Sequence, residues 1–202
     1  MSEAFAERRI DADGTAIRCF EAGKGEIVLA LHGEADTAPT PLEEMLSQKF
    51  RVISLESPSL AARSPHEAAA LIARVARTLS LERYSLIATT NAAAAGLRHA
   101  CDAAAQVAAL VLVSPAGAIG EPEARELKAT TLVLVGTRDK PAASATGRLL
   151  ADRISDGFFM LVYDAGPAME RERPAALFEA VADFLERRGR FVLERQESAL
   201  SP

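Results

Sequence analysis

The sequence has few of the residues that metal sites and oxidised scaffolds need. Its 202 residues include no tryptophan, two cysteines and three histidines. The two cysteines, Cys19 and Cys101, stand far apart in the chain and form no metal-like cluster. We therefore expect reduced cysteines that pack inside a cytosolic protein, with no metal and no cofactor.

An excess of basic charge is also lacking. The formal net charge is −5, and nucleic acids and anionic membranes both need a basic patch on their partner. No uncharged apolar stretch reaches the length that spans a bilayer, and the first ten residues are too charged for a secretory signal. We expect a cytoplasmic protein with no nucleic-acid or membrane partner.

The remaining composition is that of an ordinary globular domain. Hydrophobic residues make up 49% and charged residues 25%, and the length suits one domain with a substantial core. Many of the apolar residues are alanines, which indicates close packing of helices on a sheet. We predict a single domain over residues 1–188 and a C-terminal tail over 189–202.

Apolar runs that alternate with helical patterns predict an α/β fold. A hairpin around Asp13-Gly14 is expected within residues 8–22, and a helix is expected to begin at Ser64-Pro65. This pattern indicates a mostly parallel, twisted sheet with helices on both faces. The further strands are expected at 27–31, 52–55, 84–88, 107–113, 131–135 and 158–163, and the further helices at 42–48, 91–104, 143–154 and 174–187.

The residues that follow the strands carry the functional signal, because ligands bind beyond the carboxyl ends of an open parallel sheet. In chain order these ends read His32-Gly33-Glu34, Thr89-Thr90-Asn91, Gly136-Thr137-Arg138-Asp139 and Asp164-Ala165-Gly166-Pro167. This ordered set resembles the α/β-hydrolase superfamily over nearly the whole chain. The resemblance implies a minimal α/β-hydrolase-like fold.

The resemblance also assigns a role to each strand end, and two of the roles are filled by unsuitable residues. Thr90 takes the position of the serine nucleophile, between the small flanks Ala88 and Ala92. Asp139 takes the position of the acid. Pro167 stands where the family has its histidine, and proline cannot accept a proton.

The oxyanion hole and pocket of the family map onto Glu34, Asn91 and Thr89. The backbone amides of Glu34 and Asn91 would be the two donors. A Glu34 carboxylate that faced inward would oppose the developing negative charge, and the alternative is that it points to solvent. Without a base, Asp139 is expected to pair with Arg138 or another neighbour.

None of the three histidines obviously replaces the missing base. His32 belongs to a turn that is structural in the family, and His99 lies nine residues beyond Thr90, roughly 13 Å away along a helix. His66 starts a helix after a rim loop. It is either a surrogate base or an exposed histidine.

A cap domain, which many family members insert, is also expected to be absent. The segment 114–130, where the cap would be inserted, is short, and residues 121–128 have room for only one or two helical turns. The strand ends would then be open, so that a dry pocket is harder to build.

Three functions stay open. The first is a pseudoenzyme that binds a small polar ligand or a partner on the retained scaffold. The second is a weak or atypical esterase or lyase that uses rearranged residues such as Asp139 or His66 as base. The third is self-association as a homodimer through the tail, where Phe191-Val192-Leu193 follows a complete domain and has no evident place in the core.

Overall fold

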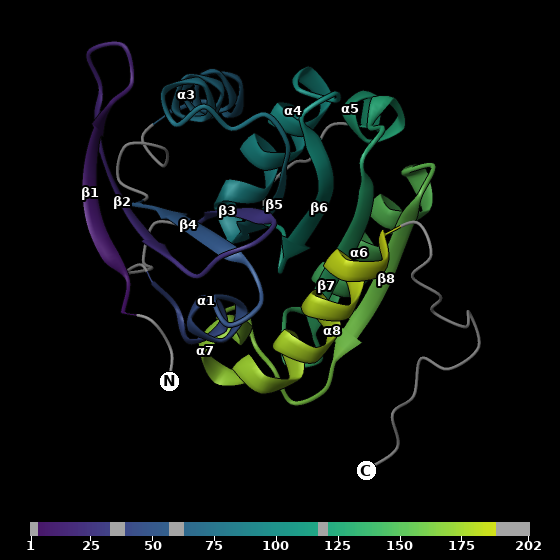
Figure 1. Cartoon of the computed structure of the whole chain (residues 1–202). Helices are drawn as coiled ribbons and strands as arrows, with labels where there is room; N and C mark the ends of the chain where they lie inside the picture. Colours follow the sequence, from purple (N-terminus) through teal and green to yellow (C-terminus); the bar gives the residue numbers. More distant parts are fainter. Residues whose placement is uncertain (1–3, 33–38, 57–62, 117–120, 189–202) are drawn as a thin grey trace.

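The structure is a computed structural model that describes residues 4–32, 39–56, 63–116 and 121–188. Its centre is an eight-stranded sheet in the order β1-β2-β4-β3-β5-β6-β7-β8 (Figure 1). The β1–β2 and β2–β4 pairs are antiparallel, and every other neighbouring pair is parallel. The predicted fold class is confirmed. The strands are β1 Ala6–Asp11, β2 Ala16–Ala22, β3 Ile27–Leu31, β4 Arg51–Leu55, β5 Tyr84–Thr89, β6 Val107–Val113, β7 Thr130–Gly136 and β8 Gly157–Val162.

Helices cover both faces of this sheet because each face carries its own apolar cluster. One cluster packs against α3, α4, α5 and α6, and the other against α1, α7 and α8. The helices are α1 Pro41–Leu46, α3 Pro65–Thr78, α4 Ala93–Asp102, α5 Glu121–Glu126, α6 Pro141–Arg153, α7 Met169–Glu172 and α8 Pro174–Arg187. No helix among the described residues is long and apolar enough to cross a bilayer.

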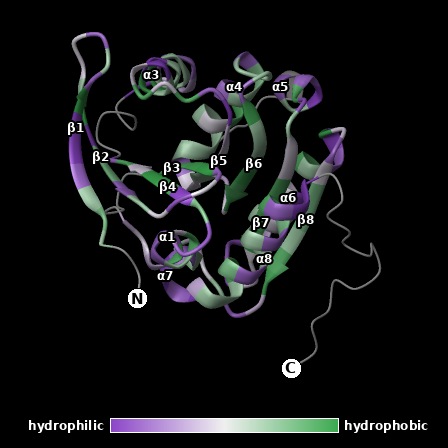
Figure 2. Ribbon diagram, in the orientation of Figure 1, coloured by the Kyte–Doolittle hydropathy of each residue, from purple (hydrophilic) through white to green (hydrophobic). Residues whose placement is uncertain are grey.

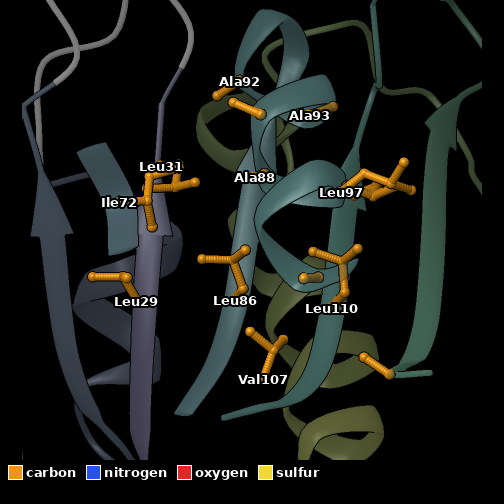
Figure 3. Close-up of a cluster of buried hydrophobic side chains, with 14 of the residues drawn as sticks. Leu29, Leu31, Ile72, Leu86, Ala88, Ala92, Ala93, Leu97, Val107 and Leu110 are labelled. Carbon is orange, nitrogen blue, oxygen red and sulfur yellow. The ribbon is translucent and has the colours of Figure 1, made fainter. Parts of the chain in front are cut away.

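Small side chains let α4 approach the sheet closely (Figure 3). A Cβ atom added to Gly96 of α4 would lie 2.6 Å from the Cβ of Ala88 on β5, which is closer than two carbons can pack. Leu97 of the same helix is fully buried, as are Leu86 and Leu110 on the strands below it. The abundance of alanine thus has the expected structural cause.

Most predicted elements are present, with shifts of one to three residues at their ends. Ser64 caps α3 as predicted, and its hydroxyl and the Glu67 carboxylate form a reciprocal capping box. A similar box between Thr40 and Glu43 begins α1. The short helix α7 was not predicted, because four residues are too few for a periodic pattern.

His99 lies away from Thr90, as predicted. It is buried in α4, where its Nε2 atom lies 2.6 Å from the hydroxyl of Tyr84 at the start of β5. Burial lowers the pKa of His99 to about 4 and raises the pKa of Tyr84 to about 12. His99 is therefore neutral at pH 7, and its Nε2 atom can accept a hydrogen bond from the Tyr84 hydroxyl, which keeps its proton.

This burial makes the stability of the fold depend on pH between about 4 and 6.5. Between pH 6.5 and about pH 4 the unfolded chain protonates His99 and the folded chain does not, so stability falls as pH falls. We expect His99→Gln to remove up to about 3 kcal/mol of that loss. Urea unfolding of both proteins across this window checks it. The carboxylates contribute equally to the pH dependence of both proteins. If the free energy of unfolding fell in parallel with pH for the wild type and His99→Gln, the assignment of this loss to His99 would be wrong.

Candidate functional site

Four neighbouring parallel strands have their carboxyl ends side by side. Thr89 of β5 is in register with Val113 of β6, Val113 with Leu134 of β7, and Gly136 of β7 with Val162 of β8. The segments that follow β5, β6, β7 and β8 therefore form one continuous rim, which we call the carboxyl rim. It contains Thr90, Ser114, Asp139 and residues 164–167.

Thr90 occupies a sharp turn directly after β5. Its φ angle is +44°, in the left-handed region that a β-branched residue rarely adopts, and it begins a single 3₁₀ turn that leads into α4. The Thr90 carbonyl accepts a hydrogen bond from the Ala116 amide at 3.1 Å, which ties the turn to the segment after β6. The turn has the strand-to-helix shape expected of an elbow, and its side chain is half-buried.

The two neighbours of Thr90 differ in exposure. The side chain of Thr89 is buried, and its hydroxyl lies 3.5 Å from the carbonyl oxygen of Leu31 on β3. Asn91 is exposed. Glu34 lies outside the described residues. His66 is exposed in the first turn of α3, and the structure gives no contact between it and Thr90.

Asp139 is held by two hydrogen bonds within the carboxyl rim. Its Oδ2 atom accepts one from the Ser114 hydroxyl at 2.9 Å and one from the Gly136 amide at 3.0 Å. Ser114 follows β6 and has a φ angle of +43°, so a second strained residue positions this contact. The partners of Asp139 are therefore a serine and a backbone amide.

Arg138 forms ion pairs with carboxylates other than Asp139. It pairs with Glu172 of α7, and its Nε atom lies 3.3 Å from Oδ1 of Asp164. Arg173 pairs with the other oxygen of Asp164, also at 3.3 Å. These exposed pairs contribute little stability singly, but they surround the turn after β8. The expected pairing partner of Asp139 is thus another neighbour, Ser114, rather than Arg138.

Pro167, where the resemblance predicts the base, lies exposed in the turn after β8. The backbone just before it is pressed onto β7, since a Cβ on Gly136 would lie 2.1 Å from the Ala165 carbonyl oxygen. The same carbonyl accepts the Arg138 amide at 2.9 Å, and the Gly166 amide donates to Glu172 at 3.0 Å. The loop that would carry a base is present and ordered by its neighbours.

His32 lies in the core, below the carboxyl rim. Its Nε2 atom is 3.0 Å from the Glu43 carboxylate and 2.9 Å from the Ser54 hydroxyl, and all three side chains are buried. Burial opposes the charge on Glu43, but His32 and the hydrogen bonds from Thr40 and Ser54 outweigh it and lower the pKa of Glu43. His32 therefore links the end of β3 to β4 and α1, and its role in the structure is to hold these elements together.

Three of these partners were not predicted from the sequence. No role is predicted above for Ser114, Glu43 or Glu172. A carboxylate at the first turn of a helix after Thr40 is the signal that reveals Glu43 as a capping residue. Among the described residues, no group of three or more histidine, cysteine, aspartate or glutamate side chains is arranged to hold a metal ion.

Comparison with known proteins shows the fold. The chain has the α/β-hydrolase fold. The structure of a predicted CIB-like hydrolase from Thermoplasma acidophilum is similar over 90% of this chain and 98% of that protein's chain, with a TM-score of 0.81 and 17% identity. A serine hydrolase involved in carbazole degradation matches 91% and 99%, with a TM-score of 0.81 and 19% identity.

An enol-lactonase from Burkholderia xenovorans gives a similar result. It matches 89% of this chain and 100% of its own, with a TM-score of 0.78 and 18% identity. No protein-family profile and no curated protein sequence matches the chain. With identities below 20%, these similarities establish the fold only, and any activity must be argued from the residues of the site.

The left-handed φ of Thr90 predicts that glycine is more stable than alanine at this position, the reverse of the order found inside a helix. At this position Thr90→Gly is expected to be more stable than Thr90→Ala by about 1 kcal/mol, because only glycine adopts such φ values freely. Ala94→Gly in the neighbouring helix is the control and should lose about 1 kcal/mol. Thermal unfolding measures all three. A glycine variant less stable than the alanine variant would show that residue 90 is not strained.

The contact between Ser114 and Asp139 predicts an energetic coupling. Ser114→Ala and Asp139→Ala should each destabilise the fold by about 1 to 2 kcal/mol, and the double variant by less than their sum. We expect a coupling of about 1 kcal/mol from chemical unfolding of the four proteins. Strict additivity would mean that the hydrogen bond contributes nothing.

Proposed function

We propose that this protein is a non-catalytic relative of the α/β-hydrolases that binds a small polar ligand at its carboxyl rim. One observation carries the proposal. The carboxylate at the acid position is hydrogen-bonded to Ser114 and the Gly136 amide, while the base position holds proline. Of the two residues that would activate a nucleophile, the carboxylate is therefore present and the base is missing.

Hydrolysis through a hydroxyl nucleophile needs a proton acceptor within hydrogen-bonding reach. His32 and His99 are buried and bonded to Glu43 and Tyr84. His66 is exposed on α3 and has no observed contact with the elbow. Asp139 accepts both of its hydrogen bonds on Oδ2 and could still orient a base through Oδ1. His32 and His99 are bonded elsewhere, however, and Pro167 cannot accept a proton.

The residue at the elbow supports the same conclusion. Thr90 presents a secondary hydroxyl, which is more hindered than that of serine, and its strained φ leaves little freedom to adjust. Retention of a strained turn without a reactive serine fits a rim kept for its shape. Residues at such angles cluster at binding sites as well as at catalytic ones.

The rim offers polar groups for a ligand rather than a dry pocket. The half-buried Thr90, the exposed Asn91 and the half-buried Asp139 provide donors and acceptors along it. The helix between β6 and β7, α5, packs on α4 and α6 and buries Ala124 in the core. In the described part of this connection nothing is inserted over the rim, which supports a capless site.

The test is an activity screen of the purified protein and its Thr90→Ala variant. The substrates are short-chain aryl esters and an enol-lactone, chosen because structural neighbours include a serine hydrolase and an enol-lactonase. We expect no turnover above the rate without protein and no difference between the two proteins. Reproducible turnover that Thr90→Ala abolishes would overturn the proposal.

A covalent probe separates the proposal from an atypical hydrolase. A fluorophosphonate reagent labels activated hydroxyl groups, and mass spectrometry locates the adduct. We expect none on this protein, and His66→Ala should behave as the wild type does. An adduct at any residue that depends on His66 would establish a rearranged catalytic site.

A ligand screen by thermal shift tests the binding half of the proposal. Small polar compounds that stabilise the wild type should lose their effect in Asn91→Ala, because binding to the folded state raises its apparent stability. Asp102→Ala, on the far end of α4, is the control and should respond as the wild type does. Equal shifts in Asn91→Ala would place binding elsewhere.

A further inference from the structure

The two edges of the sheet are built differently. β1 carries charge at four of its six positions, Glu7, Arg8, Arg9 and Asp11, and is almost wholly exposed. Charged edge strands resist pairing with other chains. β8, at the opposite edge, reads Gly-Phe-Phe-Met-Leu-Val and carries no charge. Figure 2 shows this contrast between the hydrophilic β1 and the hydrophobic β8.

The side chains of β8 are only partly covered by their own domain. Phe158 and Met160 pack towards α8, and Phe159 and Leu161 towards α6, yet all four remain half-buried. Tyr163, directly after the strand, is 65% exposed. An interior strand such as β6 has nearly every side chain buried. β8 therefore has the composition of an interior strand in an edge position.

The backbone of β8 offers hydrogen-bonding groups to a partner. The carbonyls of Asp156 and Val162 accept amides from the β7 side, at 2.9 and 3.0 Å. Because strand groups alternate in direction, the even-numbered residues face β7, and Gly157, Phe159 and Leu161 face outward. Among the described residues the sheet has no strand beyond β8.

The handedness of the fold disfavours a further parallel strand from the same chain. Connections that move from β4 towards β8 place their helices, α3, α4, α5 and α6, on one face of the sheet. α8 packs on the opposite face. A parallel strand placed outside β8 after α8 would need a left-handed crossover, whereas about 98% of such connections are right-handed.

An antiparallel strand from the same chain is disfavoured by where α8 ends. Arg188 pairs with Glu26, which directly precedes β3, so the helix ends at the amino ends of the parallel strands. An antiparallel neighbour of β8 would begin at the carboxyl end, about 20 Å away along six residues. Two residues, 189 and 190, separate Arg188 from the apolar run 191–193, and the three Cα steps between them span at most about 10 Å, which is too short for this distance.

We propose that β8 is a homodimer interface, in which β8 pairs antiparallel with β8 of a second copy across a two-fold axis. A register centred on Phe159 brings Gly157 opposite Leu161 of the second copy and uses all three outward-facing residues of each strand. Such a pairing is self-complementary and closes after two copies. It joins the two sheets into one and covers the apolar edge. The inference is independent of ligand binding at the carboxyl rim.

Sedimentation across a series from micromolar to near-millimolar protein tests the interface. We expect the full-length protein to form dimers reversibly. Met160→Lys should raise the dissociation constant at least about tenfold, because the lysine stem keeps the packing while two ammonium groups meet at the interface. Ile10→Lys, a half-buried residue on the charged edge strand β1, is the matched control and should dimerise as the wild type does.

A second variant keeps the test decisive if Met160→Lys fails to fold. Tyr163→Lys changes an exposed residue outside the strand and should also weaken the dimer. Removal of residues 190–202 should leave it intact. A protein that is monomeric throughout, a dimer equally stable in both lysine variants, or a dimer that disappears with the tail would overturn the proposal.

Discussion

The close approach of α4 to β5 is the constraint on which the elbow depends. Gly96 and Ala88 leave no room for another carbon between helix and strand. The chain must therefore leave β5 and enter α4 through an abrupt turn, and Thr90 takes a left-handed φ to make it. Packing in the core thus maintains the shape of the elbow whichever residue stands at its tip.

At the other strand ends, too, the backbone is held in place by contacts that involve no reactive side chain. The loop after β8 is held against β7 by Gly136 and by the bonds from Arg138, and none of these contacts needs a histidine at position 167. Asp139 likewise stays in place because Ser114 and the Gly136 amide hold it. The contacts that hold these turns therefore do not depend on a serine at position 90 or a histidine at position 167, which is compatible with the proposed binding role.

Much of the fold could be predicted from the sequence because its signals are local. Continuous apolar runs marked the buried parallel strands, and Ser64-Pro65 marked a helix start that the structure confirms. The partners within the site could not be predicted in this way. The contact between Ser114 and Asp139 joins residues 25 positions apart, and it depends on strand register and on a strained φ that no local pattern reveals. The position of Glu34 stays a prediction, and so does the division into a domain over 1–188 and a tail.

The central claim is that catalytic competence is missing from the arrangement of the carboxyl rim and not only from two side chains. The most direct measurement is ester hydrolysis by the double variant Thr90→Ser with Pro167→His, beside the wild type. We expect at most weak activity, because the described part of the connection between β6 and β7 inserts nothing over the rim that would shield the reacting groups from water. Robust turnover by the double variant would contradict the account and show that the rest of the site is intact.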